Sequence, residues 1–579
     1  MIDADISALN LAEAWIGAFA TALAAGDGKG AAALFEHGGQ WRDIVAFGWD
    51  IRTLPGRAAI AAMVATAPRA RDIRIAAGRT APRRVTRAGR EVVEVLFSFA
   101  TDIGTGHGVA RLIDDGDWVL AWTVSTALEA LHGDAALEAG RYAEAADYER
   151  DWGGPNWLDK RTQRASYADR DPAVLVIGAG QAGLGIAARL SRIGVDTLIV
   201  DRERRVGDNW RQRYHALTLH NEVHVNHLPY MPFPPSFPVF IPKDKLANWF
   251  EAYVDALDLN VWTGTGLESG RWIEEEKCWE VVLRRANGGT RVMRPRHLVF
   301  GTGVSSIPIM PEMPGLSDFE GEVMHSGAFT DGAPWRGRRV LVMGTGNSGH
   351  DVAQDLQASG AVVTMVQRSP TYVVSLREAQ SVYAIYNEGI PIADCDLLAT
   401  AMPHDVLRKA YQISTAASRL ADRALHEGLE KRGFRLTFGE DETGFQMMYL
   451  RRGGGYYFNV GCSDLIVSGE IVLRQYEEID RFVAEGALLK DGTVLPADLV
   501  VMATGYENQQ ETVRRVLGDA IAERVGRVWG FDSGGELANM WRPTGQEGLW
   551  FTAGSLAQCR IFSRFLAVQI KAREQGLVT

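Results

Sequence analysis

Residues 174–201 read VLVIGAGQAGLGIAARLSRIGVDTLIVD, and this stretch decides the fold. Four apolar, β-prone residues run into the turn Gly178-x-Gly180-x-x-Gly183, a helical pattern follows, and a second apolar run ends at Asp201. In such a unit the glycines permit a tight turn, close approach of a pyrophosphate and close packing of helix on strand. The helix N-terminus then faces the phosphates, and the acid lies where a ribose hydroxyl pair binds. The stretch therefore predicts a dinucleotide-binding unit.

A second complete unit follows in residues 339–368. Its turn is Gly344-Thr345-Gly346-Asn347-Ser348-Gly349, and Arg368 stands after its closing strand, where Asp201 stands in the first unit. A carboxylate at this place suits a bare ribose, whereas a guanidinium suits a 2′-phosphate. We therefore expect FAD on the first unit and NADPH on the second. Because Arg368 can also stack on adenine without a phosphate, NADH stays open as an alternative.

Further glycine turns follow strands at Gly301-Thr302-Gly303 and Ala503-Thr504-Gly505-Tyr506, and residues 548–572 read as strand, glycine and helix. These signals predict a flavin domain built from two segments, with the last helix closing over the flavin ring. Residues 228–242 are rich in proline and aromatics and are expected to form an irregular loop, either a packed surface loop or a wall of the flavin pocket. Residues 375–461 are expected to be helical. The predicted organisation is an N-terminal domain (1–150), a linker (151–170), the flavin domain (171–335 and 499–579) and the NADPH domain (336–498).

The N-terminal quarter carries no dinucleotide turn. A helix is expected over residues 9–25, followed by alternating strands over 91–102 and 108–128, which together indicate a small α+β domain. The stretch GGQWRDIVAFGWDIRTLPGRAAI resembles the cone-shaped folds of the nuclear-transport-factor-2 (NTF2)/SnoaL-like superfamily. We expect a packing or oligomerisation module rather than an independent active site, with Asp43 and His107 as structural polar groups.

Composition narrows the function classes. The 579 residues allow three or four domain-sized units, and the net charge of −11 argues against a nucleic-acid or anionic-membrane surface. No secretory signal and no apolar run long enough for a membrane span are expected. The four cysteines are far apart and form no C-x-x-C, which argues against a dithiol redox centre or a zinc knuckle and predicts no metal site. The expected location is the cytoplasm.

Residues 171–572 resemble the class B flavoprotein monooxygenases, the flavin-containing monooxygenases and their relatives. Phe319-x-Gly321-x-x-x-His325-x-x-x-Phe329 fits the signature F-x-G-x-x-x-H-x-x-x-(F/Y) between the two units; related Baeyer–Villiger enzymes usually carry tryptophan at the last position. Gly207, Asn209 and Trp210 fall in the family's flavin-binding G-G-x-W segment, with Asp208 replacing the second glycine. The stretch LPYMPFP resembles plant YUCCA-type and bacterial type II enzymes, and the N-terminal extension favours the bacterial group.

The resemblance implies an α/β fold with two Rossmann-type domains beside the α+β domain. It also implies roles for two catalytic residues. Asn221, favoured over Asn226, would support the oxygenated flavin, and His325 would act in domain communication and NADP(H) positioning. The expected cofactor-binding residues are Gly178, Gly180, Gln181, Ala182, Gly183, Asp201, Arg202, Asn209, Trp210, His220, Gly303, Gly344, Gly346, Asn347, Ser348, Gly349, Arg368, Thr504, Gly505 and Gln558.

The implied reaction takes FAD, NADPH and O2 through a C4a-(hydro)peroxyflavin, which oxygenates small ketones (Baeyer–Villiger) or soft sulfur and nitrogen nucleophiles. Alternatives are a YUCCA-type indole-3-pyruvate decarboxylating monooxygenase and, from other classes, an NADPH-dependent flavin reductase or a non-catalytic flavin-binding scaffold. A disulfide-type reductase needs paired redox cysteines, which this sequence lacks. The expected partner is a small-molecule substrate, with no nucleic acid and no membrane, and a homodimer is expected from the appended domain.

Overall fold

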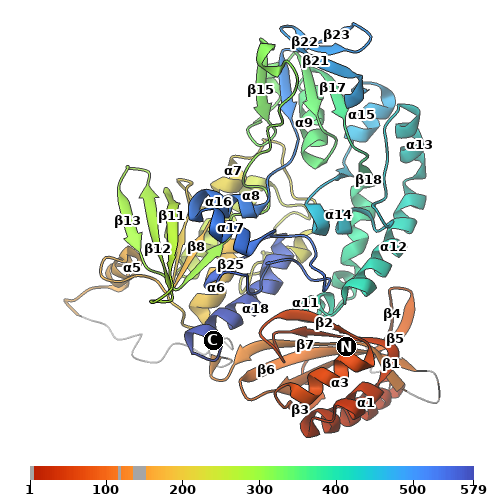
Figure 1. The fold of residues 1–579 in the computed structure, drawn as a ribbon. Coiled ribbons are helices and arrows are strands. Elements are labelled where there is room, and N and C mark those ends of the chain that lie inside the picture. The colour runs from red at the N-terminus through yellow and green to blue at the C-terminus, as the bar shows by residue number, and fades with distance from the viewer. Residues whose placement is uncertain (1–5, 115, 117–118, 135–151, 579) are drawn as a thin grey trace.

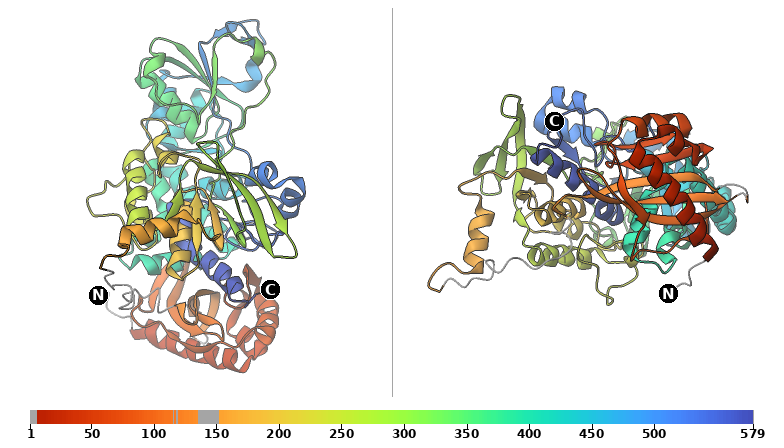
Figure 2. Two further views of the ribbon diagram at one scale, coloured as in Figure 1. Left: turned by 90° about the vertical axis from the view of Figure 1, so that its left-hand side faces the viewer. Right: turned by 90° about the horizontal axis from the view of Figure 1, so that it is seen from below.

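The two glycine turns lie in two separate parallel sheets, stacked above the N-terminal domain (Figures 1 and 2). The structure is a computed structural model and describes residues 6–114, 116, 119–134 and 152–578. The predicted domain boundary at 150–151 lies outside the described residues.

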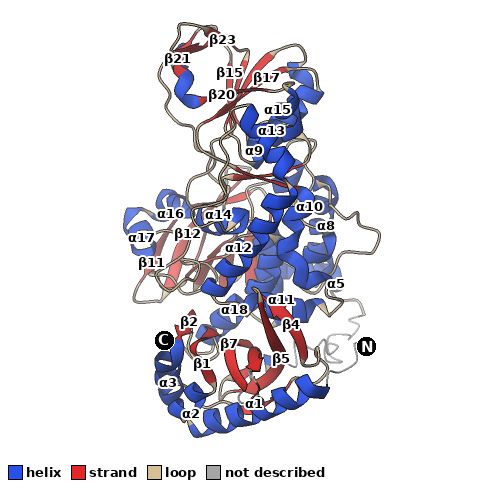
Figure 3. Cartoon of the chain, turned by 90° about the vertical axis from the view of Figure 1, so that its right-hand side faces the viewer, coloured by secondary structure: helices blue, strands red, loops and turns tan. Residues whose placement is uncertain are grey.

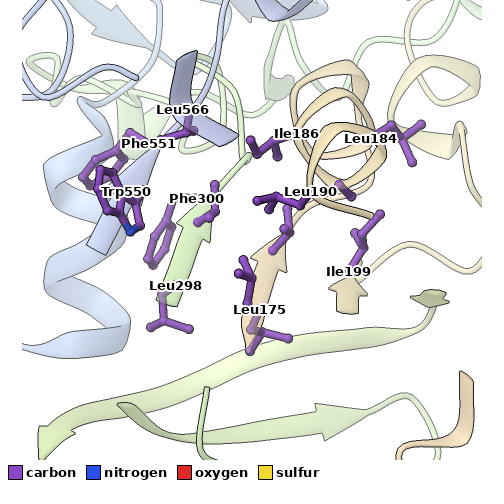
Figure 4. Close-up of a cluster of buried hydrophobic side chains, with 14 of the residues drawn as sticks. Leu175, Leu184, Ile186, Leu190, Ile199, Leu298, Phe300, Trp550, Phe551 and Leu566 are labelled. Atoms are coloured by element: carbon purple, nitrogen blue, oxygen red, sulfur yellow. The ribbon is translucent and has the colours of Figure 1, made fainter. Parts of the chain in front are cut away.

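The first unit is built on five parallel strands in the order β10-β9-β8-β14-β25. Its sheet strands are β8 (Val174–Ile177), β9 (Thr197–Val200), β10 (Asn260–Trp262), β14 (His297–Phe300) and β25 (Leu549–Phe551). These short apolar runs are covered on both faces, as parallel strands require. Figure 4 shows Leu190 packed between strand residues Leu175 and Ile199, with Phe300 facing Trp550 and Phe551. Because β25 pairs with β14, the prediction that two chain segments form this domain is confirmed.

Helices and an antiparallel meander complete the first unit. They are α6 (Gln181–Arg192), α7 (Asp208–Arg211), η2 (Val223–Val225), α8 (Lys243–Ala256), β11 (Thr265–Ile273), β12 (Cys278–Arg285), β13 (Thr290–Met293), α16 (Gln509–Leu517), α17 (Asp519–Val525) and α18 (Leu556–Glu574). Between η2 and α8, residues 228–242 form no helix or strand, as predicted.

The second unit has a parallel sheet in the order β15-β24-β16-β17-β20. Its elements are η3 (Leu316–Asp318), β15 (Glu322–His325), η4 (Ala333–Trp335), β16 (Arg339–Met343), α9 (Asn347–Ala358), β17 (Val362–Gln367), α13 (Arg423–Lys431), α15 (Cys462–Ser468), β20 (Val472–Gln475), η6 (Tyr476–Glu478), β21 (Ile479–Val483), β22 (Gly486–Leu489), β23 (Val494–Pro496) and β24 (Leu499–Met502). The predicted boundaries of 336 and 498 are wrong at both ends, because β15 and β24 pair with each other and β24 pairs with β16.

A helical region lies between the second unit and the N-terminal domain (Figure 3). It contains β18 (Tyr372–Ser375), α10 (Leu376–Ala379), η5 (Gln380–Asn387), α11 (Ile392–Thr400), α12 (His404–Ala421), α14 (Gly444–Arg452) and β19 (Tyr456–Asn459). The prediction that residues 375–461 are mainly helical is therefore confirmed.

The segment predicted to be a linker from its polarity contains a helix. Residues of the predicted linker form α5 (Trp157–Ser166), which begins with a capping box between Asn156 and Asp159. Such a box satisfies two helix N-terminal donors locally and needs no apolar face. Tyr167 then anchors the chain, because its buried hydroxyl donates to Asp196 Oδ1 at 2.7 Å.

The described residues of the N-terminal domain form a seven-stranded sheet and three helices, so the predicted α+β class is observed. The sheet order is β2-β1-β7-β6-β5-β3, with β4 pairing β5, and β1 runs parallel to β7. Its elements are α1 (Ile6–Ala25), α2 (Gly28–Ala33), β1 (Phe35–Ile44), β2 (Ile51–Pro55), α3 (Gly56–Thr66), β3 (Arg71–Ile75), β4 (Arg83–Arg87), β5 (Arg90–Ala100), β6 (Gly104–Asp114) and β7 (Val119–Leu131).

Helix α1 supplies large apolar side chains to the core of this domain. Its segment Ser7–Ala25 is long and apolar enough to cross a membrane, so the expectation that no apolar run has this length is wrong. In this fold, Trp15, Phe19 and Leu23 are buried in the domain core, where the Phe19 ring lies 5.2 Å from that of Trp41.

Candidate functional site

One cavity of about 1110 Å³ reaches both glycine turns. Gly178, Gly180, Gln181 and Ala182 line it from the first unit, and Asn347 and Ser348 line it from the second. The two predicted nucleotide sites therefore open into a shared space, which two nucleotides need in order to exchange a hydride.

The first turn is shaped for close backbone contact. Gly178 has φ +105°, and a Cβ there would lie 2.8 Å from the Gly301 carbonyl oxygen. A Cβ on Gly183 would lie 1.8 Å from the Gly178 carbonyl oxygen, so α6 can pack here only without a side chain. Gly180 caps α6 without a side-chain hydrogen bond, which leaves the first N–H groups of the helix available to an anion. This geometry fits a dinucleotide pyrophosphate.

Asp201 follows β9 and lines the cavity beside Arg202. Its carboxylate accepts hydrogen bonds from the backbone N–H of Ala179 at 2.6 Å and of Glu203 at 2.8 Å, while burial raises its pKa above the usual value. The carboxylate is thus fixed at the strand end where a ribose is expected.

The segment after Asp201 shows why this chain can carry Asp208 in place of the second glycine of the G-G-x-W pattern. Gly207 has φ +88°, and its Cβ would lie 2.6 Å from the Ala247 carbonyl oxygen, so glycine is required there. Asp208 is already the first residue of α7, where a side chain is tolerated. Asn209 and Trp210 line the cavity, and Trp210 Nε1 donates to Gln181 Oε1 at 3.3 Å.

Helix α18 begins at the same cavity. Gln558 completes a capping box by accepting from the Ser555 N–H at 3.0 Å, and its Oε1 also accepts from the Tyr449 hydroxyl at 3.0 Å. Gln181 Nε2 reaches the Gly554 carbonyl at 3.3 Å. The α18 N-terminus is thereby joined to the first turn, as the role predicted for the last helix requires.

The second turn repeats the same design. Gly344 has φ +121°, and its Cβ would lie 2.5 Å from the Ala503 carbonyl oxygen, while a Cβ on Gly349 would lie 2.2 Å from the Gly344 carbonyl oxygen. Gly346 caps α9 without a side-chain bond. Asn347 Oδ1 accepts from the Phe458 N–H at 3.0 Å and so ties the turn to β19. The second turn likewise fits a pyrophosphate.

Arg368 follows β17, and its side chain is exposed. The structure gives its guanidinium no hydrogen bond or ion pair with the described residues, although its carbonyl accepts from Arg435. It does not line the cavity, which suits a group that reaches the outer end of a dinucleotide. Its phosphate-binding role stays a prediction.

His325 ends β15 and is buried. Its Nε2 donates to the Gly505 carbonyl at 3.0 Å, and its Nδ1 accepts from the Gly327 N–H at 3.0 Å, an arrangement that fixes the neutral tautomer. Burial lowers its pKa, as expected for this arrangement. Thr504 does not line the cavity; its hydroxyl donates to the Ile309 carbonyl at 2.6 Å. Both contacts lie where the chain passes between the two units, and the catalytic role of His325 stays a prediction.

Asn221 and Asn226 both line the cavity. The Asn221 side chain is hydrogen-bonded to the Tyr383 hydroxyl, as is Gln446. Asn226 is fully buried and donates Nδ2 to the Asn221 carbonyl at 2.9 Å. Asn226 therefore supports the backbone of Asn221, whose side chain belongs to the cavity wall.

His220 and Gly303 also line the cavity. The His220 ring lies 4.7 Å from that of Phe458, and desolvation by the surrounding protein lowers the pKa of His220 to about 4. Residues 228–242 do not line the cavity, so the structure favours a packed loop over a pocket wall.

One set of residues on the cavity wall has no counterpart in the sequence prediction. We call it the aromatic compartment, defined by its lining residues Val382, Tyr383, Tyr386, Thr400, Met402, His404, Leu407, Tyr411, Phe445, Gln446, Tyr449, Tyr456, Phe458, Phe531, Glu536, Leu537, Ile561, Phe562 and Arg42. They come from the helical region, the chain before α18, α18 itself and the N-terminal domain. No motif marks these residues, because each reaches the cavity through tertiary packing alone.

The four cysteines, Cys278, Cys395, Cys462 and Cys559, are all free and buried. No group of three or more His, Cys, Asp or Glu side chains in the described part of the chain is arranged to hold a metal ion.

Residues 175–388 match the family of pyridine nucleotide-disulphide oxidoreductases. The chain is 30% identical over 339 residues to the probable indole-3-pyruvate monooxygenase YUCCA4 of Arabidopsis thaliana, covering 58% of this chain and 76% of the relative. It is 31% identical over 342 residues to the probable indole-3-pyruvate monooxygenase YUCCA7 of the same plant, covering 58% and 74%. The chain belongs to the flavin-containing monooxygenase family.

A solved structure shows the same fold. Cyclohexanone monooxygenase with bound epsilon-caprolactone matches with a TM-score of 0.50 and 18% identity, covering 70% of this chain and 88% of that chain. As a flavin-containing monooxygenase, this protein is an FAD-dependent oxidoreductase that uses NADPH and O2. FAD supplies the redox and oxygen chemistry, and the protein supplies binding, orientation and exclusion of water.

Proposed function

We propose that this monooxygenase oxygenates small uncharged organic molecules, with ketones as the leading class and sulfides or amines as related substrates. The observation that carries the proposal is the aromatic compartment. Its walls are aromatic and aliphatic, and Arg42 and Glu536, the two charged side chains that line it among the described residues, pair with each other.

The tyrosines of the compartment are neutral. Burial raises the pKa of Tyr383 to about 12 and raises the pKa values of Tyr411, Tyr449 and Tyr456 further. Neutral phenols and the amides of Asn221 and Gln446 can hydrogen-bond a carbonyl but cannot compensate a buried charge. An uncharged substrate with one polar group suits such walls.

The overall reaction of a ketone would balance as follows. One oxygen atom of O2 enters the C–C bond beside the carbonyl to give an ester, the other leaves as water, and NADPH with one proton supplies two electrons. The chain's own part is to hold the nicotinamide and flavin nucleotides on the two turns and to keep water out of the aromatic compartment.

Indole-3-pyruvate is the second candidate, because the relatives named above carry that substrate in their names. Its indole suits the aromatic walls, but the guanidinium that lines the aromatic compartment, that of Arg42, is already bonded to Glu536 and is not free to pair with its carboxylate. This pairing favours the uncharged substrate.

The deciding experiment supplies ¹⁸O₂ and NADPH with acetophenone, thioanisole or indole-3-pyruvate in turn. We expect one ¹⁸O atom in the product of acetophenone or thioanisole, with NADPH consumed in equal amount. Label only in the indole-3-pyruvate reaction would favour the alternative. Release of hydrogen peroxide with every compound, and label in no product, would contradict the proposed substrates.

We also propose NADPH as the preferred donor over NADH, supported by the free guanidinium of Arg368. A bacterial type II-like enzyme with an NTF2/SnoaL-like N-terminal domain is supported by the helix-backed curved sheet of that domain. A cytoplasmic location is a proposal supported by the free cysteines, and the absence of nucleic-acid or membrane partners is one supported by the net charge of −11. A homodimer is a proposal supported by the appended N-terminal domain.

A further inference from the structure

Helix α11 is held at both ends by the N-terminal domain. In its first turn, the buried Asp394 carboxylate accepts from Arg79 Nη1 at 2.8 Å, from the Thr80 N–H at 2.8 Å and from the Thr80 hydroxyl at 2.6 Å. At its other end, Arg111 Nη2 donates to the Leu398 carbonyl at 3.1 Å. The last carbonyls of a helix lack partners within it and carry partial negative charge, so a guanidinium stabilises that end.

Arg42 completes this attachment and reaches the cavity. Its Nη1 donates to the Thr400 carbonyl at the end of α11. Its Nε and Nη2 bond Glu536 Oε1 and Oε2 at 3.0 and 2.6 Å, with both side chains at most 10% exposed. Thr53 adds a hydroxyl bond to Glu536 at 3.1 Å. One guanidinium from β1 therefore joins α11 to the chain before α18.

A second buried cluster holds the neighbouring segment. Glu94 is fully buried and accepts from Arg87 Nε and Arg111 Nε, both at 2.9 Å. Arg87 also bonds Glu388 at 2.5 Å, and Glu388 directly follows η5. Since η5 carries Tyr383, the N-terminal domain is attached to the segment that bonds Asn221.

All the segments attached in this way line the aromatic compartment. Tyr383 and Tyr386 come from η5, Thr400 from the end of α11, and Glu536 from the chain before α18. Arg42 itself lines the cavity. We propose that the N-terminal domain forms part of the active site, and that Arg42 is a positioning residue that fixes the wall of the aromatic compartment. The use of acetophenone as the probe ligand rests on the proposed function, whereas the attachment of the N-terminal domain to η5, α11 and the chain before α18 does not.

The test uses the full chain loaded with FAD and compares wild type with Arg42→Ala. Removing the guanidinium frees the end of α11 and leaves Glu536 unpaired. We expect faster backbone hydrogen exchange in residues 392–402 and a dissociation constant for acetophenone raised about fivefold or more, with unchanged FAD content. The matched control is Arg71→Ala in the same domain, whose ion pair with Asp102 is exposed, and which should change neither quantity.

Arg42→Lys keeps the charge beside Glu536 but cannot bond both carboxylate oxygens and the Thr400 carbonyl together. It replaces Arg42→Ala if that variant does not fold, and a rise in exchange at 392–402 is again expected. Exchange at 392–402 equal to wild type would overturn the proposal, whatever the ligand result. Wild-type binding of acetophenone without oxygenation would refute the proposed substrate and leave the exchange test of the domain's role intact.

Discussion

The imidazole of His325 donates through Nε2 to the carbonyl oxygen of Gly505 at 3.0 Å, which joins the end of β15 to the turn after β24. These two strands are neighbours in the second sheet, although about 180 residues separate them. The same turn continues into the first unit, so one side chain holds the junction between the two nucleotide sites.

His325→Gln should slow the reduction of bound flavin by NADPH more than it weakens FAD binding, because the flexible amide does not hold its donor and acceptor at the positions of the two ring nitrogens. The pKa of His325 is lowered, so it binds fewer protons folded than unfolded, and its contribution to stability is lost as the pH falls below about 6.5. Melting temperatures between pH 7.5 and 5.5 should therefore fall more for wild type than for the variant. An equal fall in melting temperature for wild type and His325→Gln over this pH range would contradict a neutral His325 side chain.

Gly183→Ala and Gly349→Ala should separate the two sites. The added methyl would lie 1.8 Å from the Gly178 carbonyl oxygen in the first case and 2.2 Å from that of Gly344 in the second. We expect the first variant to lose FAD, measured by absorbance after purification, and the second to retain FAD while losing reduction by NADPH. Loss of NADPH reduction from Gly183→Ala with full FAD content would show that the units are assigned in the wrong order.

Arg368→Ala should raise the KM for NADPH by about tenfold or more, because charge-assisted hydrogen bonds to a phosphate are lost. The KM for NADH should change little. Arg377→Ala is a matched control, since that side chain is 94% exposed and does not line the cavity. Equal effects of Arg368→Ala on both donors would refute the role at the 2′-phosphate.

Glu94→Gln should destabilise the chain by about 3–5 kcal/mol at neutral pH, because it leaves buried arginines without their counter-charge. Burial raises the pKa of Glu94, but Arg111, Arg87 and Arg83 outweigh this and hold it near 2. Its contribution is complete above about pH 4.5 and is lost as the pH falls toward 2. Denaturant midpoints of wild type and variant should therefore converge below pH 4.5. A constant difference would contradict an ionised Glu94.

The sequence was enough to predict both glycine turns, the strands beside them and the two-segment first unit, because these depend on local residue types. The boundary at 336 was wrong because β15 joins a parallel sheet whose neighbouring strand, β24, comes from far along the chain. Helix α5 was missed because its capping box stabilises a helix without an apolar face. The aromatic compartment and Arg42 could not be predicted, since only tertiary packing brings Arg42 beside Glu536, 494 residues away.

The ion pairs of the N-terminal domain also determine the order in which its contacts can form during synthesis. Three of its charged side chains form ion pairs with residues much later in the chain: Arg87 with Glu388, Arg42 with Glu536, and Glu129 with Arg564 in α18. During translation this domain emerges before the segments that carry Glu388, Glu536 and Arg564, so its core of α1 and the sheet forms while its own charged side chains are still hydrated. The contacts that attach it to η5, α11 and α18 form only after these later segments have emerged, so the wall of the aromatic compartment is completed after the domain's own core has formed.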